Sequence, residues 1–190
     1  MSNYEKIERA KPSGFDSSLW WSQEISKLNK NELVGILKTL TNRTGGNIHD
    51  NGTIEISSNS INGPNFEPKN MVDFNSKNYY ASIEKYDSYV RFDFLDQKIQ
   101  IQSYLIKTPT SQDDKYYLKN WVVEVSNDTY RWIQIDSHEN NLRSLNGNGR
   151  ECIFNVSKTN ELYRYVQIRQ TKRDLFCIAK IDFFGKLYVP

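Results

Sequence analysis

The chain has 190 residues, 37% of them hydrophobic and 13% aromatic, with a formal net charge of +2 and a mean hydropathy of -0.72. This length suits one domain with a substantial core and a terminal extension. The small net charge argues against a nucleic-acid partner, because binding to a phosphate backbone needs clustered Lys and Arg. No apolar run approaches the roughly 20 residues that span a bilayer, and the first residues lack the apolar stretch of a secretion signal. We therefore expect a cytoplasmic protein without a membrane span.

The first 44 residues are expected to form an extension that contains one short helix. Most of this stretch is polar, but it also carries Trp20 and Trp21. Their aromatic surface is expected to dock either on the main domain, which we favour, or on a partner.

The helix of this extension is expected to begin near Asn31, a residue type that caps helices, and to end at Gly45-Gly46. One apolar face on one short helix predicts an accessory element that packs against a sheet. The apolar residues at helical spacing are Leu33, Ile36, Leu37 and Leu40.

The pattern from residue 45 to residue 190 is that of β-strands. Short runs with apolar residues at alternate positions recur at roughly ten-residue spacing, separated by polar stretches. This pattern predicts an all-β fold, an antiparallel β-sandwich of the jelly-roll type. The expected extended segments are 53–56, 70–74, 79–82, 89–94, 99–106, 121–126, 132–135, 151–156, 163–170 and 176–184.

A hairpin near the centre of this core is the clearest local prediction. Trp121, Val123 and Val125 alternate with Val122, Glu124 and Ser126, which is the period of a strand with one buried face. Residues 126–129 form a turn, and a second strand with Trp132, Ile133 and Ile135 follows. The hairpin is a structural element and indicates no chemistry.

The order of these segments resembles the discoidin domain, also called the coagulation-factor type C domain, of the galactose-binding-like superfamily. The matching segments are 54–58, 67–73, 89–94, 118–128, 163–171 and 181–185, together with Trp132. The start at 45–50 is similar to an intracellular branch of the family, whose domains are often attached to BTB, kelch or repeat modules. The resemblance implies a discoidin-like β-sandwich over residues 45–190 and a binding role without catalysis.

The two cysteines, Cys152 and Cys177, lie in apolar strand-like runs and are expected to be buried thiols in a reducing compartment. Secreted members of the family often clamp the ends of the sandwich with a disulfide. Cys152 and Cys177 do not lie at those ends, which agrees with an intracellular location.

The sequence offers little for catalysis. Its two histidines, His49 and His138, are far apart and belong to no metal-binding spacing. No nucleophile elbow, phosphate loop or dinucleotide-binding motif is present, and the carboxylate pair Asp113-Asp114 lies in a polar loop. We therefore expect no enzymatic activity.

The resemblance places ligands at loops on one end of the sandwich, here 62–67, 79–85, the loop after Thr108 and 169–176. Sugar-binding relatives combine planar aromatic groups with Arg, Asn and carboxylate side chains, which fix the orientation of hydroxyl groups. An equivalent of the His and Arg pair seen in those relatives is not found. The available candidates are Asn65, Phe66, Glu67, Tyr80, Lys85, Arg169, Lys172 and Arg173. The alternative is that Tyr80 is core and that Glu67 and Lys85 are solvated.

Some relatives carry a structural calcium ion near the segment 73–76 of this chain. Asp73 and Asn75 are the residues that would contribute oxygen ligands. Phe74 stands where relatives usually have Gly, so a plain turn capped by Asp73 is favoured and no cofactor is expected.

The function favoured at this level is a recognition module that binds a protein or peptide through the end loops. A carbohydrate-binding module and a structural domain without a small ligand are the alternatives. The basic tract of Arg164, Arg169, Lys172 and Arg173 would suit an acidic peptide or a phosphate group, although such a tract is more often solvated.

Overall fold

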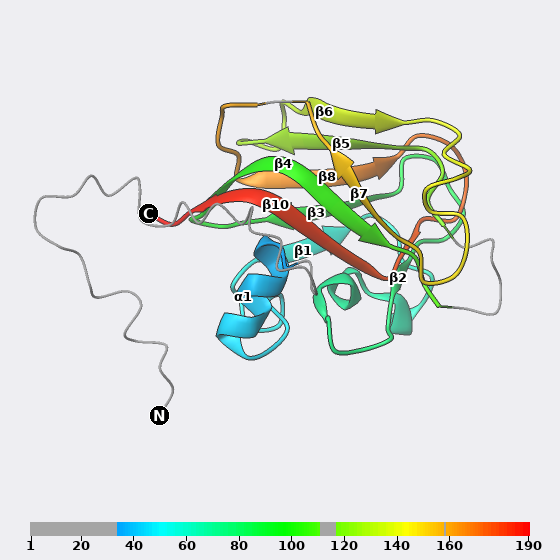
Figure 1. The fold of residues 1–190 in the computed structure, drawn as a ribbon, viewed down its shortest axis with the longest axis horizontal. Coiled ribbons are helices and arrows are strands. Elements are labelled where there is room, and N and C mark those ends of the chain that lie inside the picture. Colours follow the sequence, from blue (N-terminus) through cyan, green and yellow to red (C-terminus); the bar gives the residue numbers. More distant parts are fainter. Residues whose placement is uncertain (1–33, 111–116, 158) are drawn as a thin grey trace, which may run out of the picture.

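A computed structural model of the chain describes residues 34–110, 117–157 and 159–190. Two antiparallel sheets face each other, which confirms the predicted β-sandwich (Figure 1). The five-stranded sheet has the order β1 (Glu55–Ser58), β3 (Tyr89–Asp93), β8 (Tyr165–Gln170), β5 (Trp121–Ser126), β6 (Ile133–His138). The three-stranded sheet has the order β10 (Lys180–Tyr188), β4 (Lys98–Lys107), β7 (Glu151–Asn155), and a small sheet pairs β2 (Tyr80–Ala81) with β9 (Cys177–Ile178).

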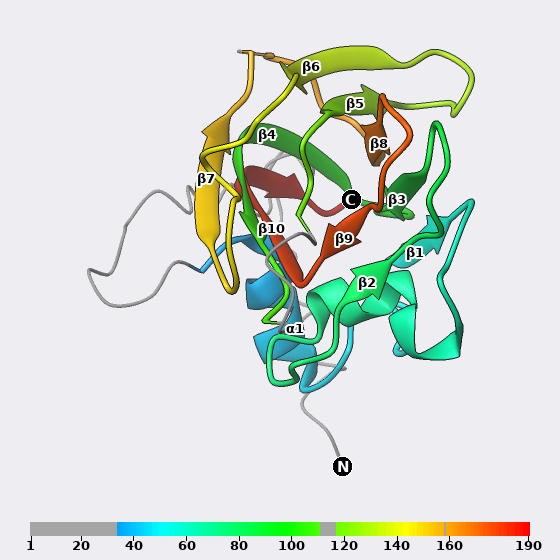
Figure 2. The same ribbon diagram turned by 90° about the vertical axis from the view of Figure 1, so that its right-hand side faces the viewer.

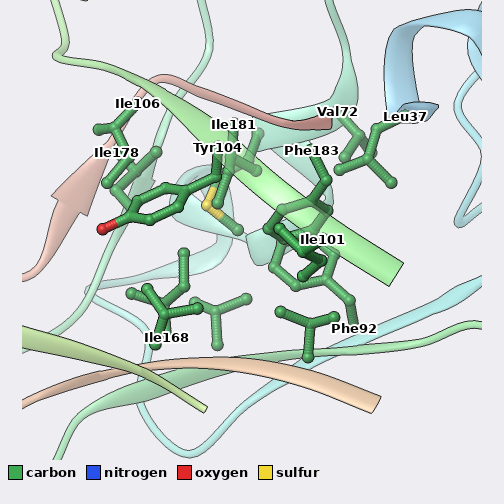
Figure 3. Packing of buried hydrophobic residues seen from close by; sticks show 14 of the residues in the cluster. Leu37, Val72, Phe92, Ile101, Tyr104, Ile106, Ile168, Ile178, Ile181 and Phe183 are labelled. Atoms are coloured by element: carbon green, nitrogen blue, oxygen red, sulfur yellow. The ribbon is translucent and has the colours of Figure 1, made fainter. Parts of the chain in front are cut away.

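The core lies between the two large sheets, where alternate residues of each strand point inward. Figure 3 shows Phe92 and Ile168 of the five-stranded sheet facing Ile101, Tyr104 and Phe183 of the three-stranded sheet. All five side chains are at most 2% exposed, and Phe92 meets Phe183 edge to face with ring centroids 5.2 Å apart. Aromatic pairs in this geometry add stability beyond the area that they bury.

The predicted hairpin is present as the antiparallel pair β5 and β6. The expectation of a single buried face on β5 is wrong, because all six of its residues are buried. β5 lies between β8 and β6, and ion-paired polar side chains cover its outer face. Trp132 lies just before β6, where the Arg91 guanidinium packs over its ring at 4.8 Å.

The segment 70–74 is not extended, which corrects another expectation. It belongs mainly to the 3₁₀ helix η4 (Pro68–Val72), which follows the shorter 3₁₀ helix η3 (Pro64–Phe66). Each begins with proline, whose fixed φ angle suits the first turn of a helix. Met71 and Val72 are fully buried from this helical turn, so a strand is not needed to bring them into the core.

Helix α1 (Ile36–Thr44) ends where the sequence predicts, with Gly45 in the left-handed conformation at φ 73°. Its buried residues Ile36, Leu37 and Leu40 belong to the same core as the sandwich, and α1 contacts β10 and η4. Figure 1 shows α1 beside β10. The domain boundary predicted between residues 44 and 45 stays a prediction.

The start of α1 is held by a carboxylate from a distant strand. Asp182 of β10 accepts hydrogen bonds from the amides of Gly35 and Leu37, both at 2.8 Å, and from Lys38 at 3.4 Å. These are amide groups that a helix cannot pair internally. Gly35 leaves room for the carboxylate, since a Cβ there would lie 2.4 Å from Asp182 Cγ.

The expected cap Asn31, as well as Leu33, Trp20 and Trp21, lie outside the described residues. Within the described ranges, no helix has the length and apolar character needed to cross a membrane.

Candidate functional site

One end of the sandwich gathers the loops in which the sequence places ligand binding. β1, β4, β6 and β8 end there, and β3, β5, β7 and β10 begin there, because the strand pairs are antiparallel. We call this the loop end; Figure 2 views the molecule from this end. Its described segments are 59–67, 82–88, 108–110, 117–120, 139–150 and 171–176.

Arg169 is built into the sheet at the loop end. Its guanidinium donates two hydrogen bonds to the Glu124 carboxylate, at 3.1 and 2.8 Å, and a third at 3.0 Å to Asp87. Glu124 is 9% exposed and also accepts a hydrogen bond from Gln167. Hydrogen bonding to Glu124 raises the pKa of Arg169. Arg169 therefore anchors the loop that contains Asp87. The sequence predicts a ligand-binding role for Arg169, but its guanidinium is already paired with two carboxylates.

The other three predicted cations each meet an oxygen from a neighbouring loop. Lys85 also forms a β-bridge with Asp174, which fastens the segment 82–88 alongside 171–176. The four cationic residues among the ligand candidates therefore lie at one end of the molecule, and each already has a partner; they are Lys85, Arg169, Lys172 and Arg173. The three contacts are Lys85 Nζ to the Asn59 carbonyl at 3.3 Å, Lys172 Nζ to Asn140 Oδ1 at 3.4 Å, and Arg173 Nε to Glu84 Oε1 at 3.8 Å.

Asn65, Phe66 and Glu67 lie together around η3 and the start of η4. The Asn70 side chain donates to the Asn65 carbonyl at 2.8 Å, and the Phe66 ring lies 5.0 Å from that of Tyr79. Asn65 is exposed, whereas Phe66 and Glu67 are half-buried. Glu67 also pairs with Lys69 at 3.2 Å.

Tyr80 cannot contact a ligand in this structure, which corrects its place among the candidates. Its side chain is fully buried and packs edge to face against Phe176, with ring centroids 5.4 Å apart. Its hydroxyl donates to the Ser60 carbonyl at 2.8 Å, and burial raises its pKa. The alternative expectation, that Tyr80 belongs to the core, is the one the structure supports.

An open groove of about 670 Å³ runs along the outer edge of β1. Of the predicted ligand residues, Glu67 lines this groove. The His49 imidazole borders it as well, and its Nδ1 accepts a hydrogen bond from the Ile56 amide at 3.1 Å. The remaining lining residues are Ile56, Ser57, Ser58, Asn59, Ser60, Ile61, Pro68 and Lys69.

Sequence reasoning missed Tyr86, the exposed aromatic residue of the segment 82–88. Its side chain is 64% exposed, and it stands between Lys85 and Asp87, which are tied to neighbouring segments as described above. Ile83 of the same segment is 50% exposed. A polar context with no clear alternation gave no signal for this arrangement.

Beneath these loops, three buried side-chain oxygens have no hydrogen-bond partner among the described residues: Ser88 Oγ, Gln170 Oε1 and Thr171 Oγ1. The Gln170 amide donates to the Ser88 carbonyl at 2.8 Å, so these two residues are neighbours where β8 ends and β3 begins. Buried polar atoms nearly always have partners in folded proteins. The inner part of the loop end is therefore polar and retains hydrogen-bonding capacity.

Neither histidine belongs to a metal-binding cluster among the described residues, where no group of three His, Cys, Asp or Glu side chains could hold a metal ion. His138 stacks on Trp121 with ring centroids 4.3 Å apart and contacts Asp136 at 2.9 Å. Tyr104 donates to the same carboxylate at 2.6 Å and accepts from Trp121 Nε1 at 2.8 Å. Burial opposes the ionisation of Asp136, but these hydrogen bonds hold its pKa below its ordinary value. The network joins the two sheets.

The thiols of Cys152 and Cys177 are both free, Cys177 being buried and Cys152 half-buried. Burial raises the pKa of Cys177 to about 12, which makes it an inert thiol at neutral pH.

Comparison with solved structures identifies the fold. The module CpGH89CBM32-5 from Clostridium perfringens, in complex with GalNAc-β-1,3-galactose, superposes with a TM-score of 0.57 at 11% identity, over 70% of this chain and 96% of that one. The chain has the galactose-binding-like β-sandwich fold. The family 32 carbohydrate-binding module of C. perfringens NanJ, in complex with galactose, gives 0.55 at 10% identity, over 72% of this chain and 94% of that one.

The C-terminal domain of a chitobiase from Bacteroides fragilis gives a TM-score of 0.56 at 16% identity, over 73% of this chain and 96% of that one. These neighbours confirm the discoidin-like fold that the sequence motifs predicted. No protein-family model and no curated protein sequence matches the chain.

Proposed function

We propose that the chain is a non-catalytic carbohydrate-binding module that contacts a glycan at the loop end, with Tyr86 as its planar contact surface. The observation that carries the proposal is the exposed Tyr86 ring on a segment fixed by three polar links. Lys85 is bridged to Asp174, Asp87 is paired with Arg169, and Glu84 lies 3.8 Å from Arg173.

The chemistry of this surface suits a sugar. An aromatic ring offers an apolar plane for the C–H face of a pyranose, and fixed polar groups at its border orient hydroxyl groups. The residues on either side of Tyr86, Lys85 and Asp87, are tied to the segment 171–176 and to Arg169, so the backbone that carries the ring is held in place before a ligand binds. The structural neighbours that are described in complex with galactose or GalNAc-β-1,3-galactose support the same ligand class.

A glycan array followed by calorimetric titration tests the proposal, with galactose and GalNAc-β-1,3-galactose as the first ligands. We expect Tyr86→Ala to lower the affinity by about fivefold, since stacking surface contributes on the order of 1 kcal/mol. The matched control is Tyr130→Ala, which removes a ring that is 90% exposed in the β5–β6 turn at the opposite end. Equal binding by both variants, or no glycan bound by the wild type, would reject the proposal.

This proposal replaces the protein- or peptide-binding function that the sequence favoured, because the comparisons agree better with carbohydrate binding. Protein binding stays the second candidate on one observation. Ile61 and Ile83 are 43% and 50% exposed on adjacent loops, joined by the hydrogen bond from the Asn62 amide to the Ala81 carbonyl. A lysate partner captured by the wild type and lost from an Ile61→Ser, Ile83→Ser variant, together with an empty glycan array, would favour this candidate.

We also propose a cytoplasmic location. Two free thiols suit a reducing compartment, since oxidising compartments favour disulfides. Fluorescence microscopy of the full-length protein in its own cell, together with cell fractionation, tests the location.

A further inference from the structure

The ammonium group of Lys180 contacts the backbone on both sides of the segment 73–76, for which the resemblance raised a calcium ion. Lys180, the first residue of β10, is 8% exposed. Its Nζ donates to the carbonyl oxygens of Asn70 and Asn78, at 2.9 and 2.8 Å. These carbonyls flank the turn that contains Asp73, and the Asp73 charge favours the ammonium form. A cation therefore already stands among the oxygens of this turn.

Backbone carbonyls with a nearby carboxylate are also the ligands that calcium takes, with about six to eight oxygens in all. The residues present do not fit a calcium ion, because the ammonium lies between two of those carbonyls and would repel a divalent cation. Asp73 Oδ1 instead accepts the Asn75 amide at 3.3 Å, as expected for a plain turn. We propose that Lys180 is the internal cation of the segment 70–78 and fastens it to β10 in place of a metal ion.

The charge is retained at neutral pH. Burial lowers the pKa of Lys180 to about 8, with Asp73 opposing the shift and Lys107 adding to it. Two carbonyl partners at hydrogen-bond distance offset part of the cost of burying the charge.

The segment that Lys180 holds supports a predicted recognition loop. Asn70, whose carbonyl accepts from Lys180, donates through its side chain to the carbonyls of Asn65 and Tyr79. The Phe66 ring lies against Tyr79. Lys180 is thus a positioning residue for the loop of residues 64–67, and this consequence alone depends on the proposed function.

The test is a charge reversal, Lys180→Glu, with Lys186→Glu on the same strand as the matched control. Glu at position 180 joins the carbonyls of Asn70 and Asn78 and the Asp73 carboxylate, which gives an oxygen-rich set. We expect calcium to raise the melting temperature of Lys180→Glu, and magnesium to raise it less, because magnesium prefers a rigid octahedral site. The wild type and Lys186→Glu are expected to melt equally with calcium and with chelator.

A rise in the melting temperature of the wild type with calcium would overturn the proposal, as would a Lys180→Glu variant that does not respond to calcium. Hydrogen exchange of Lys180→Met gives a second readout that does not depend on the reversed charge. Its amides at 70–79 are expected to exchange about tenfold faster than in the wild type, because the two carbonyls lose their donor. Unchanged exchange there would also overturn the proposal. No readout uses a sugar, so failure of the carbohydrate proposal leaves these results interpretable.

Discussion

Replacing Gly35 by Ala tests the long-range cap that joins α1 to β10. The added Cβ would stand 2.4 Å from Asp182 Cγ and 2.5 Å from its Oδ1. Carbon contacts become ordinary at 3.4 Å, so the two groups must separate by 1.0 Å, the difference between these distances. Gly35 does not need a left-handed backbone, because its φ angle is -91°. The effect of the substitution is therefore steric.

The expected loss of stability comes from the hydrogen bonds that this displacement breaks. The amides of Gly35 and Leu37 each lie 2.8 Å from the Asp182 carboxylate, and a 1.0 Å shift takes such a bond beyond hydrogen-bond length. Hydrogen bonds to a charged group contribute about 1.5–3 kcal/mol each, so we expect a loss of about 3 kcal/mol or more.

Urea denaturation followed by tryptophan fluorescence measures this loss, with Gly46→Ala as the control. A Cβ at Gly46 would have no neighbour within 4 Å, so that substitution is expected to change the free energy of unfolding by less than about 1 kcal/mol. If Gly35→Ala and Gly46→Ala unfold at the same urea concentration, the contact between Gly35 and Asp182 does not hold the helix.

Two further substitutions have defined expectations. Burial raises the pKa of Asp182 from 3.8 to about 7, although four backbone amides donate to its carboxylate. The stabilisation that Asp182 contributes is therefore fully present below the unfolded pKa and is lost as the pH rises through 7. Relative to Asp182→Asn, the free energy of unfolding of the wild type should fall by about 1.4 kcal/mol per pH unit between these values, and parallel pH profiles would refute this. Arg169→Ala leaves the Glu124 carboxylate with Gln167 as its remaining side-chain partner and should cost about 2 kcal/mol, a buried-pair loss reduced for partial exposure. The control is Arg173→Ala, which breaks the exposed pair of Arg173 and Glu84. In the same thermal melts it should lower the free energy of unfolding by less than about 0.5 kcal/mol.

Local patterns predicted the elements that local physics determines. The alternation over residues 89–94 gave β3, observed as Tyr89–Asp93, because a strand buried on one face needs that period. Gly45 marked the end of α1, because a left-handed residue is needed there and glycine adopts it without strain. The segment 70–74 has the same apolar character as a strand, but Pro68 begins a 3₁₀ turn that buries Met71 and Val72 equally well.

The candidate site was predicted less well, because its geometry depends on distant partners. Position in the sequence placed Arg169 at the loop end, but not its pairing with Glu124, 45 residues away, which makes it an anchor. Tyr80 has the residue type of a sugar-binding surface, yet its ring is in the core. Tyr86 is exposed on a segment that is bridged to 171–176, a pairing that no local pattern encodes.

The alternating pattern of strand β10 determines both the residues that enter the core and the charged residues that meet α1 and η4 on the other face. Ile181 and Phe183 point into the core, so the period of two directs Lys180 and Asp182 to the other face. That face is covered by α1 and η4, and both charges are therefore buried. Each is matched to backbone groups of the covering element: the ammonium to carbonyls that bracket the turn after η4, and the carboxylate to the free amides at the start of α1. If the two residues were exchanged, the carboxylate would face backbone carbonyls and the ammonium would face backbone amides, and both contacts would be repulsive. The order of Lys180 and Asp182 along β10 therefore determines where α1 and the turn after η4 pack on this strand.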